Sequence, residues 1–174
     1  MASAADQITS ETISESIHLL EQSVRKIEHC LKQLDSDQIW WRPAPELNSI
    51  GNLILHICGN LNQWAVNGIP DLPDERQRDL EFRADISLSV DELTGLMNQT
   101  VAQAAAVIHS LSPENLLETR QIQGFTVTVL GAISHTVPHF VGHAHQIIYL
   151  TRLQLDNAYQ FDWFPGSQQK RVPI

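Results

Sequence analysis

Four of the chain's eight histidines lie close together near its C-terminal end, at His135, His139, His143 and His145. His135, His139 and His143 recur every four residues, and residues at this spacing lie on one face of an α-helix. Two histidines four residues apart on a helix can place their ring nitrogens around a single transition-metal ion. The sequence therefore predicts a histidine metal site on a helix in this region.

His56 lies far away in the sequence but has a similar position in its own helical pattern. It lies on the flank of that pattern's apolar stripe, and His139 also lies about 120° from the centre of its stripe. Asn60 and Gln63 lie near His56. Because periodicity does not show that the two flanks face each other, a histidine-rich surface that titrates with pH is the alternative.

The first of four helical patterns contains apolar residues spaced alternately four and three apart, which is typical of a seam buried against neighbouring helices. We expect Thr9 or Ser10 to cap its start, and the pattern stops near residues 35–37. The seam consists of Ile13, Ile17, Leu20, Val24, Ile27, Leu31 and Leu34.

Three further helices follow from capping signals and periodicity. The second runs from about Ser49 to Val66, and the third begins at a capping box over residues 89–92. The fourth runs from about Thr128 to Leu155. Its start, residues 125–130, is rich in β-branched residues and could form a short strand, but we favour a loop that passes into the helix.

The long polar connection at residues 67–88 would let the second and third helices run parallel. We therefore expect an all-α four-helix bundle with a long crossover, in one domain that spans residues 1–174. We also expect the tail at residues 156–174 to pack on the bundle through its aromatic residues, Tyr159, Phe161, Trp163 and Phe164.

Composition limits the possible partners. The 174 residues are 43% hydrophobic and 18% charged, with a formal net charge of −9, so binding to nucleic acid or to an anionic membrane is disfavoured. The chain has no secretory signal pattern and no apolar run long enough for a membrane span. Two cysteines, Cys30 and Cys58, fit reduced thiols and predict a cytoplasmic location.

Two segments resemble the DinB-like, or YfiT-type, family of metal-binding proteins. Residues 53–64 are similar to the family's pattern of a histidine, an asparagine four residues later and then a tryptophan. Residues 139–150 are similar to its pattern of two histidines four apart, followed by glutamine and isoleucine. Residues 78–82 and 165–167 resemble a subgroup more weakly. The similarity extends over about residues 5–170.

The resemblance implies an up-down-down-up four-helix bundle with a divalent metal, zinc or nickel, held by His56, His139 and His143. Homodimers are common in the family. Some of its members transfer low-molecular-weight thiols or isomerise substrates with the help of a thiol, and many have no established activity.

The chain departs from the family pattern at two positions. His145 replaces a glycine, and because it lies about 160° from His139 around the helix it is a poor fourth ligand. Pro138 removes a backbone donor and clashes with the carbonyl of Ser134, which predicts a bend within the histidine row.

Three neutral imidazoles would leave a divalent ion its full charge, so that a bound water or small thiol becomes a nucleophile near neutral pH. We therefore expect a metal-dependent enzyme of the hydrolase or thiol S-transferase type that acts on a small molecule. The alternative is a non-catalytic metal-binding bundle that serves as a binding or stress-response module. The sequence does not identify a general base, since Asp37 and Glu46 fit solvated loop charges. Candidates for orienting the ligands or contacting the substrate are Asn60, Gln146, His135 and Arg78.

Overall fold

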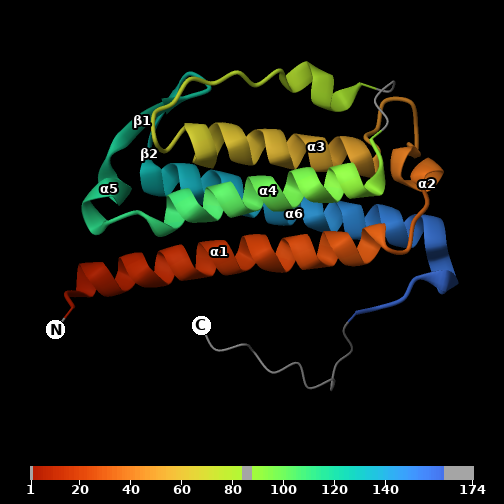
Figure 1. Cartoon of the computed structure of the whole chain (residues 1–174), viewed down its shortest axis with the longest axis horizontal. Helices are drawn as coiled ribbons and strands as arrows, with labels where there is room; N and C mark the ends of the chain where they lie inside the picture. Colours follow the sequence, from red (N-terminus) through yellow and green to blue (C-terminus); the bar gives the residue numbers. More distant parts are fainter. Residues whose placement is uncertain (1, 84–87, 163–174) are drawn as a thin grey trace.

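The computed structural model describes residues 2–83 and 88–162, and within these ranges four long helices lie side by side (Figure 1). They are α1 (Ala4–Leu31), α3 (Ile50–Leu61), α4 (Val90–His109) and α6 (Val129–Leu155). α1 and α6 run in one direction along the bundle, and α3 and α4 run in the opposite direction. The predicted all-α bundle of up-down-down-up type is therefore confirmed.

Helices α3 and α4 begin at the predicted capping residues. The Ser49 hydroxyl accepts a hydrogen bond from the backbone N–H of Asn52, and the Ser89 hydroxyl accepts one from that of Glu92. In both cases the side chain three residues into the helix bonds back to the capping residue, which completes a capping box. Local sequence therefore determines where both helices begin.

Helix α1 begins earlier than predicted. Its capping residue is Ser3, which forms a reciprocal capping box with Asp6, so the expectation that Thr9 or Ser10 caps the helix is wrong. The apolar seam begins only at Ile13, and the turns before it are started by this box rather than by apolar burial.

A β-hairpin precedes α6, where we expected a loop. Strand β1 (Thr119–Ile122) pairs antiparallel with β2 (Phe125–Thr128). Gln123 and Gly124 between them have φ angles of 52° and 80°, the left-handed values of a type I′ turn, whose twist suits a two-residue hairpin. The β-branched segment therefore forms a strand, and α6 begins directly after it.

Shorter helical segments connect the long ones. A π-helix, η1 (Asn62–Asn67), continues α3, and η2 (Arg78–Phe82) and η3 (Asp156–Ala158) are 3₁₀ turns. The remaining two are α2 (Ser36–Trp40) and α5 (Pro113–Leu117).

The core lies between the long helices and is formed by the apolar stripe of each. The predicted seam of α1 is buried except at Ile17, which is only partly covered. In the part of the chain that the structure describes, no helix has the combination of length and hydrophobicity needed to cross a membrane. The largest fully buried side chains include Leu20, Ile27, Ile54, Ile57, Leu93, Met97, Phe140 and Ile147.

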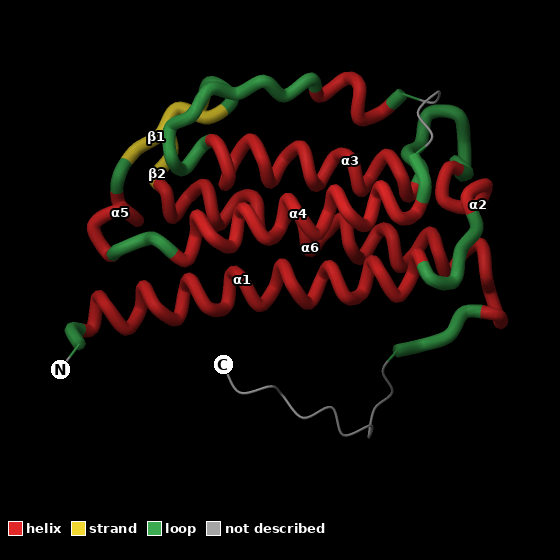
Figure 2. Tube along the Cα trace, viewed as in Figure 1, coloured by secondary structure: helices red, strands yellow, loops and turns green. Residues whose placement is uncertain are grey.

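The connection between α3 and α4 folds back over α3 (Figure 2). Asn52 of α3 is fully buried and donates from Nδ2 to the carbonyl oxygens of Glu81 and Arg83, at 2.9 and 3.0 Å. These bonds hold the connection on α3, so that η2 lies against this helix. The long crossover lets α3 and α4 run parallel, as predicted.

The segment after α6 packs against α1. Tyr159 is partly buried, and its ring lies edge-on to those of His29 and Phe161. Trp163 and Phe164, which we expected to pack here too, lie outside the described residues. α6 continues through Pro138, and the bend expected there stays a prediction.

We expect Gly51→Ala to destabilise the fold by about 1–3 kcal/mol, the usual cost of overpacking. A Cβ at Gly51 would lie 2.6–2.8 Å from ring carbons of Trp40. That ring is held in place by a hydrogen bond from its Nε1 to the carbonyl of Leu88 at 3.0 Å. The measurement is the urea midpoint of unfolding.

The matched control is Gly95→Ala in α4, where a Cβ would have no neighbour within 4 Å. We expect this variant to gain up to about 1 kcal/mol, because alanine favours a helix more than glycine does. Equal effects of the two substitutions would contradict the close packing of Trp40 on α3.

Candidate metal centre

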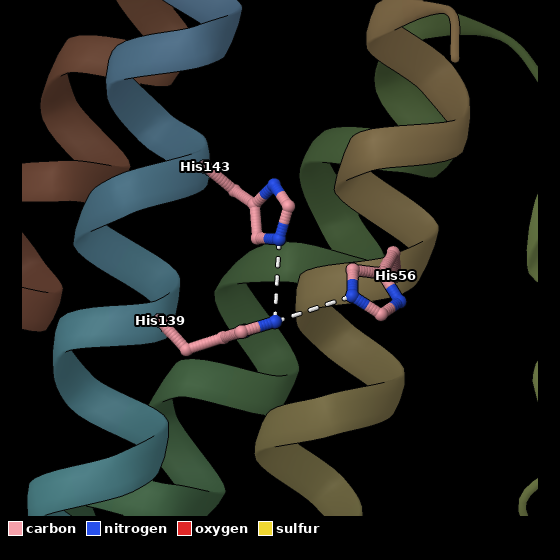
Figure 3. Close-up of side chains that lie close together, drawn as sticks. All are labelled: His56, His139 and His143. Atoms are coloured by element: carbon pink, nitrogen blue, oxygen red, sulfur yellow. Dashed lines mark hydrogen bonds between the residues drawn. The ribbon is translucent and has the colours of Figure 1, made fainter. Parts of the chain in front are cut away.

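His56, His139 and His143 come together between α3 and α6 (Figure 3). His139 and His143 project from one face of α6, as their spacing predicts, and His56 reaches them from α3. His56 is buried, with 7% of its surface exposed, and the other two residues are partly buried. Helical periodicity did not show whether the flank of His56 and the flank of His139 and His143 face each other, and in the structure they do.

The ring nitrogens converge on one point. The Nε2 atoms of His56 and His143 each lie 3.2 Å from Nε2 of His139. The candidate ligand atoms of the three residues all lie within 4.8 Å of one another. Nitrogens that share a tetrahedral zinc ion at about 2.0–2.1 Å would lie about 3.3 Å apart. The spacing of the imidazole nitrogens therefore fits an ion of this size.

Hydrogen bonds on the outer side of two rings determine which ring nitrogen carries the proton when the ring is neutral. His56 Nδ1 donates to Glu81 Oε2, and His143 Nδ1 donates to Gln146 Oε1, both at 2.9 Å. Because a carboxylate or amide oxygen can only accept, the proton of each neutral ring lies on Nδ1. The Nε2 lone pairs of His56 and His143 then point at Nε2 of His139. A cation bound among the three nitrogens would stabilise this arrangement.

Glu81 is buried and is held by Arg76. Arg76 donates from Nε to Oε1 at 2.6 Å and from Nη2 to Oε2 at 2.7 Å. The same Nη2 lies 3.2 Å from His56 Nδ1, a longer approach than that of the carboxylate to this nitrogen. Burial raises the pKa of Glu81, but the hydrogen bonds from Arg76 and His56 and the charge of Arg76 outweigh burial and hold this pKa below its ordinary value. The ionised carboxylate therefore orients His56, as carboxylates commonly do for metal-ligating histidines.

Arg76 is positioned by α3 and its π-helical extension. It donates from Nη1 to Gln63 Oε1 at 2.8 Å, and Gln63 also donates to the Asp74 carboxylate. Gly59, one turn before Gln63, provides the space for this ion pair. A Cβ at Gly59 would overlap the Glu81 carboxylate and lie 3.0 Å from Arg76 Nε.

Two ligand candidates have lowered pKa values. Burial, together with the charges of the neighbouring histidines and Arg76, lowers the pKa of His139 to about 4. Burial also lowers the pKa of His143, against the opposing effect of its hydrogen bond to Gln146. Both rings are therefore neutral at pH 7, the form that binds a metal ion.

Of the two amide candidates, one contacts the cluster. Gln146 bonds to His143, as described above. Asn60 is buried instead against α6, where its Oδ1 accepts a hydrogen bond from the Thr136 hydroxyl at 2.8 Å. Asn60 therefore joins the two helices that carry the histidines.

The two remaining candidates lie at the edges of the cluster. The His135 ring lies between those of Trp64 and His139, at centroid distances of 4.0 and 5.9 Å. Arg78 is exposed, and its guanidinium carbon lies 4.9 Å from the ring centre of Phe82, which in turn lies 4.9 Å from that of His56. His145 is exposed and lies outside the group of candidate ligands, as expected.

Glu81 and Arg76 were not predicted as part of the site. Glu81 appeared only within the weaker similarity at residues 78–82. The polar residues of the second predicted helix could have indicated these two residues. Asn52, His56 and Gln63 lie on a largely buried stripe, and buried polar groups need hydrogen-bond partners. The polar connection at residues 67–88 was the nearest source of those partners.

Comparison with known proteins agrees with the fold. Residues 7–165 match a family model described as "Protein of unknown function (DUF1572)". No curated protein sequence matches the chain. A conserved protein from Enterococcus faecalis shares 19% identity with it, over 82% of this chain and 96% of that one, with a TM-score of 0.68.

A DinB-like protein from Bacillus cereus ATCC 10987 is also similar in structure. It shares 13% identity, over 76% of this chain and 85% of that one, with a TM-score of 0.60. At these identities the two likenesses concern the fold. The chain therefore belongs to the DUF1572 family of proteins of unknown function and has the DinB-like fold.

Proposed function

We propose that the protein is a metal-dependent enzyme in which His56, His139 and His143 hold a divalent transition-metal ion, zinc or nickel. The observation that carries this proposal is the convergence of the three Nε2 atoms, with neighbouring pairs 3.2 Å apart. Three protein ligands are typical of catalytic metal sites, whereas structural zinc sites generally have four.

When bound, such an ion would make water or a low-molecular-weight thiol nucleophilic near neutral pH, which suits a hydrolase or a thiol S-transferase. The chain's own residues orient the ligands. Glu81 and Gln146 hold the protons of His56 and His143 on Nδ1, away from the ion. Arg76 keeps Glu81 ionised for this task.

The thiol in such a reaction would come from a small molecule rather than from the protein. Burial raises the pKa of Cys58 to about 12, and burial likewise raises the pKa of Cys30. Neither thiol is therefore a thiolate at neutral pH, and the thiolate is the nucleophilic form.

Arg78 is our candidate for contact with the substrate. Its position over Phe82, next to His56, places an exposed guanidinium beside the cluster. A guanidinium recognises carboxylates with two parallel hydrogen bonds, so we infer a substrate with a carboxylate.

A non-catalytic metal-binding bundle is the second candidate. It is favoured by the position of Glu81, the carboxylate in contact with the cluster, whose two oxygens are engaged by Arg76 and His56. A carboxylate bound in this way orients a ligand and is poorly placed to accept a proton from a nucleophile. Homodimerisation and a cytoplasmic location stay predictions for either function.

We expect the protein, purified without a histidine tag, to bind one zinc or nickel ion per chain. His139→Ala should weaken zinc affinity at least about 100-fold, since it removes the ligand that both other rings approach. Elemental analysis and a competition titration with a chelator measure both quantities. The matched control is His145→Ala on the same helix, which should keep full occupancy.

Turnover separates the two candidate functions once metal binding is established. Small thiols with electrophiles, and small esters or amides, are incubated with the metal-loaded protein and with His139→Ala. Thiol consumption or hydrolysis that is lost in this variant supports the enzyme. Stoichiometric metal without turnover supports the binding module, and occupancy well below one ion per chain contradicts both.

We expect Glu81→Gln to weaken zinc binding about 10–100-fold, the range found when a residue that orients a ligand is lost. Gly59→Ala should act in the same direction, because its Cβ displaces the Glu81 carboxylate. Gly95→Ala is the control for adding a methyl group to a helix elsewhere. Unchanged affinity in Glu81→Gln would show that His56 is oriented without its carboxylate.

We expect the metal-free protein to lose stability as the pH falls from about 6.5 towards 4. His139 has a lower pKa when folded than when unfolded, so the unfolded chain binds the proton more readily in this interval. The stabilisation is complete above the unfolded pKa near 6.5 and is lost as the pH falls to the folded value of about 4. Urea midpoints in chelator at pH 7.5 and 5 measure it, and His139→Gln should lose less than the wild type. An equal loss in both proteins would refute this assignment.

A further inference from the structure

A pocket lies between α1, α6 and the segment that follows η3. It encloses about 530 Å³, within the range of small-molecule sites. Residues of α1 and α6 line it, together with Tyr159 and Phe161. The metal centre lies between a different pair of helices, α3 and α6, so the two sites are distinct (Figure 1).

The pocket concentrates positive charge in an acidic chain. Arg25, Lys26 and Arg152 line it, and among the described lining residues Asp162 is the one carboxylate. Within residues 2–83 and 88–162, no carboxylate lies within ion-pair distance of any of the three cations. Even Glu21, which lies one helical turn before Arg25, forms no ion pair with it. Cations that lie together without an ion pair to a described carboxylate repel one another, and an anion bound among them would reduce that repulsion.

Aromatic rings position one of the cations. The guanidinium carbon of Arg152 lies 5.1 Å from the ring centre of Phe161 and 5.9 Å from that of Tyr159. The two rings pack edge-on to each other at 5.0 Å. Among the described residues none accepts a hydrogen bond from the guanidinium of Arg152, so its N–H donors are available to an anion.

Hydrogen bonds to His29 of α1 and to Gln33, just after this helix, hold the segment that carries the two aromatic rings. The carbonyl oxygen of Gln160 accepts from His29 Nε2 at 2.6 Å and from Gln33 Nε2 at 3.3 Å. The backbone N–H of Gln160 donates to Gln33 Oε1 at 2.7 Å. Because Gln160 lies between the two aromatic residues, these bonds fix both rings relative to the basic residues of α1.

We propose that this pocket binds a small organic anion made of a flat apolar group and a carboxylate or phosphate. Arg25, Lys26 and Arg152 hold the charged group, and the flat part lies against the rings of Tyr159 and Phe161. The metal centre takes no part in this binding.

The test measures binding of benzoate, phenyl phosphate and benzamide to the full chain by calorimetry at low ionic strength. Benzamide has nearly the shape of benzoate but no charge. We expect benzoate or phenyl phosphate to bind at least tenfold more tightly than benzamide, and the tighter of the two identifies the charged group. Arg152→Gln should weaken this binding at least tenfold, and added salt should weaken it too.

Arg25→Gln is the second test variant and leaves the contacts of Arg152 with the rings intact. Lys32→Gln is the matched control. Lys32 is exposed, follows the last residue of α1 and lies outside the pocket, and its substitution removes the same charge. Loss of affinity in Arg152→Gln and Arg25→Gln, but not in Lys32→Gln, supports the proposal. Equal binding of benzoate and benzamide, an equal loss in Lys32→Gln, or no binding of either anion would overturn it.

Discussion

The buried ion pair between Arg76 and Glu81 is the interaction on which the candidate metal centre depends. Three imidazoles can direct lone pairs at one point only if their protons are held elsewhere, and for His56 the Glu81 carboxylate does this. A buried carboxylate stays ionised only with a partner, which Arg76 provides through two short hydrogen bonds. Arg76 is in turn held by Gln63, and Gly59 leaves the room that the pair needs.

This dependence explains why the connection between α3 and α4 is long and polar. A short loop would have been enough to join the two helices in an antiparallel hairpin, but here they run parallel, so the chain must return along the whole bundle. The returning segment is held down by Asn52 and supplies both members of the ion pair. The same topological requirement therefore sets the direction of α4 and completes the surroundings of His56.

The two sites of the molecule use α6 in different ways. Its inner flank presents His139 and His143 to α3, while near its C-terminal end Arg152 lies against aromatic residues that pack on α1. In the first site neutral rings converge, and burial keeps them neutral. In the second, permanent cations lie near the surface, where solvent lowers the cost of keeping them together.

The helices and the ligand spacing could be predicted from the sequence, because both follow from local rules. The periods of α1 and α6, the capping boxes at Ser49 and Ser89, and the four-residue step from His139 to His143 are all set within a few turns of chain. The sequence did not distinguish a loop from a strand at residues 125–128, because pairing with β1 decides between the two. The contact of His56 with the α6 pair and the ion pair between Glu81 and Arg76 could not be predicted, because they depend on how distant segments pack. Helical periodicity places a side chain on a face, but only the packing of distant segments determines what that face contacts.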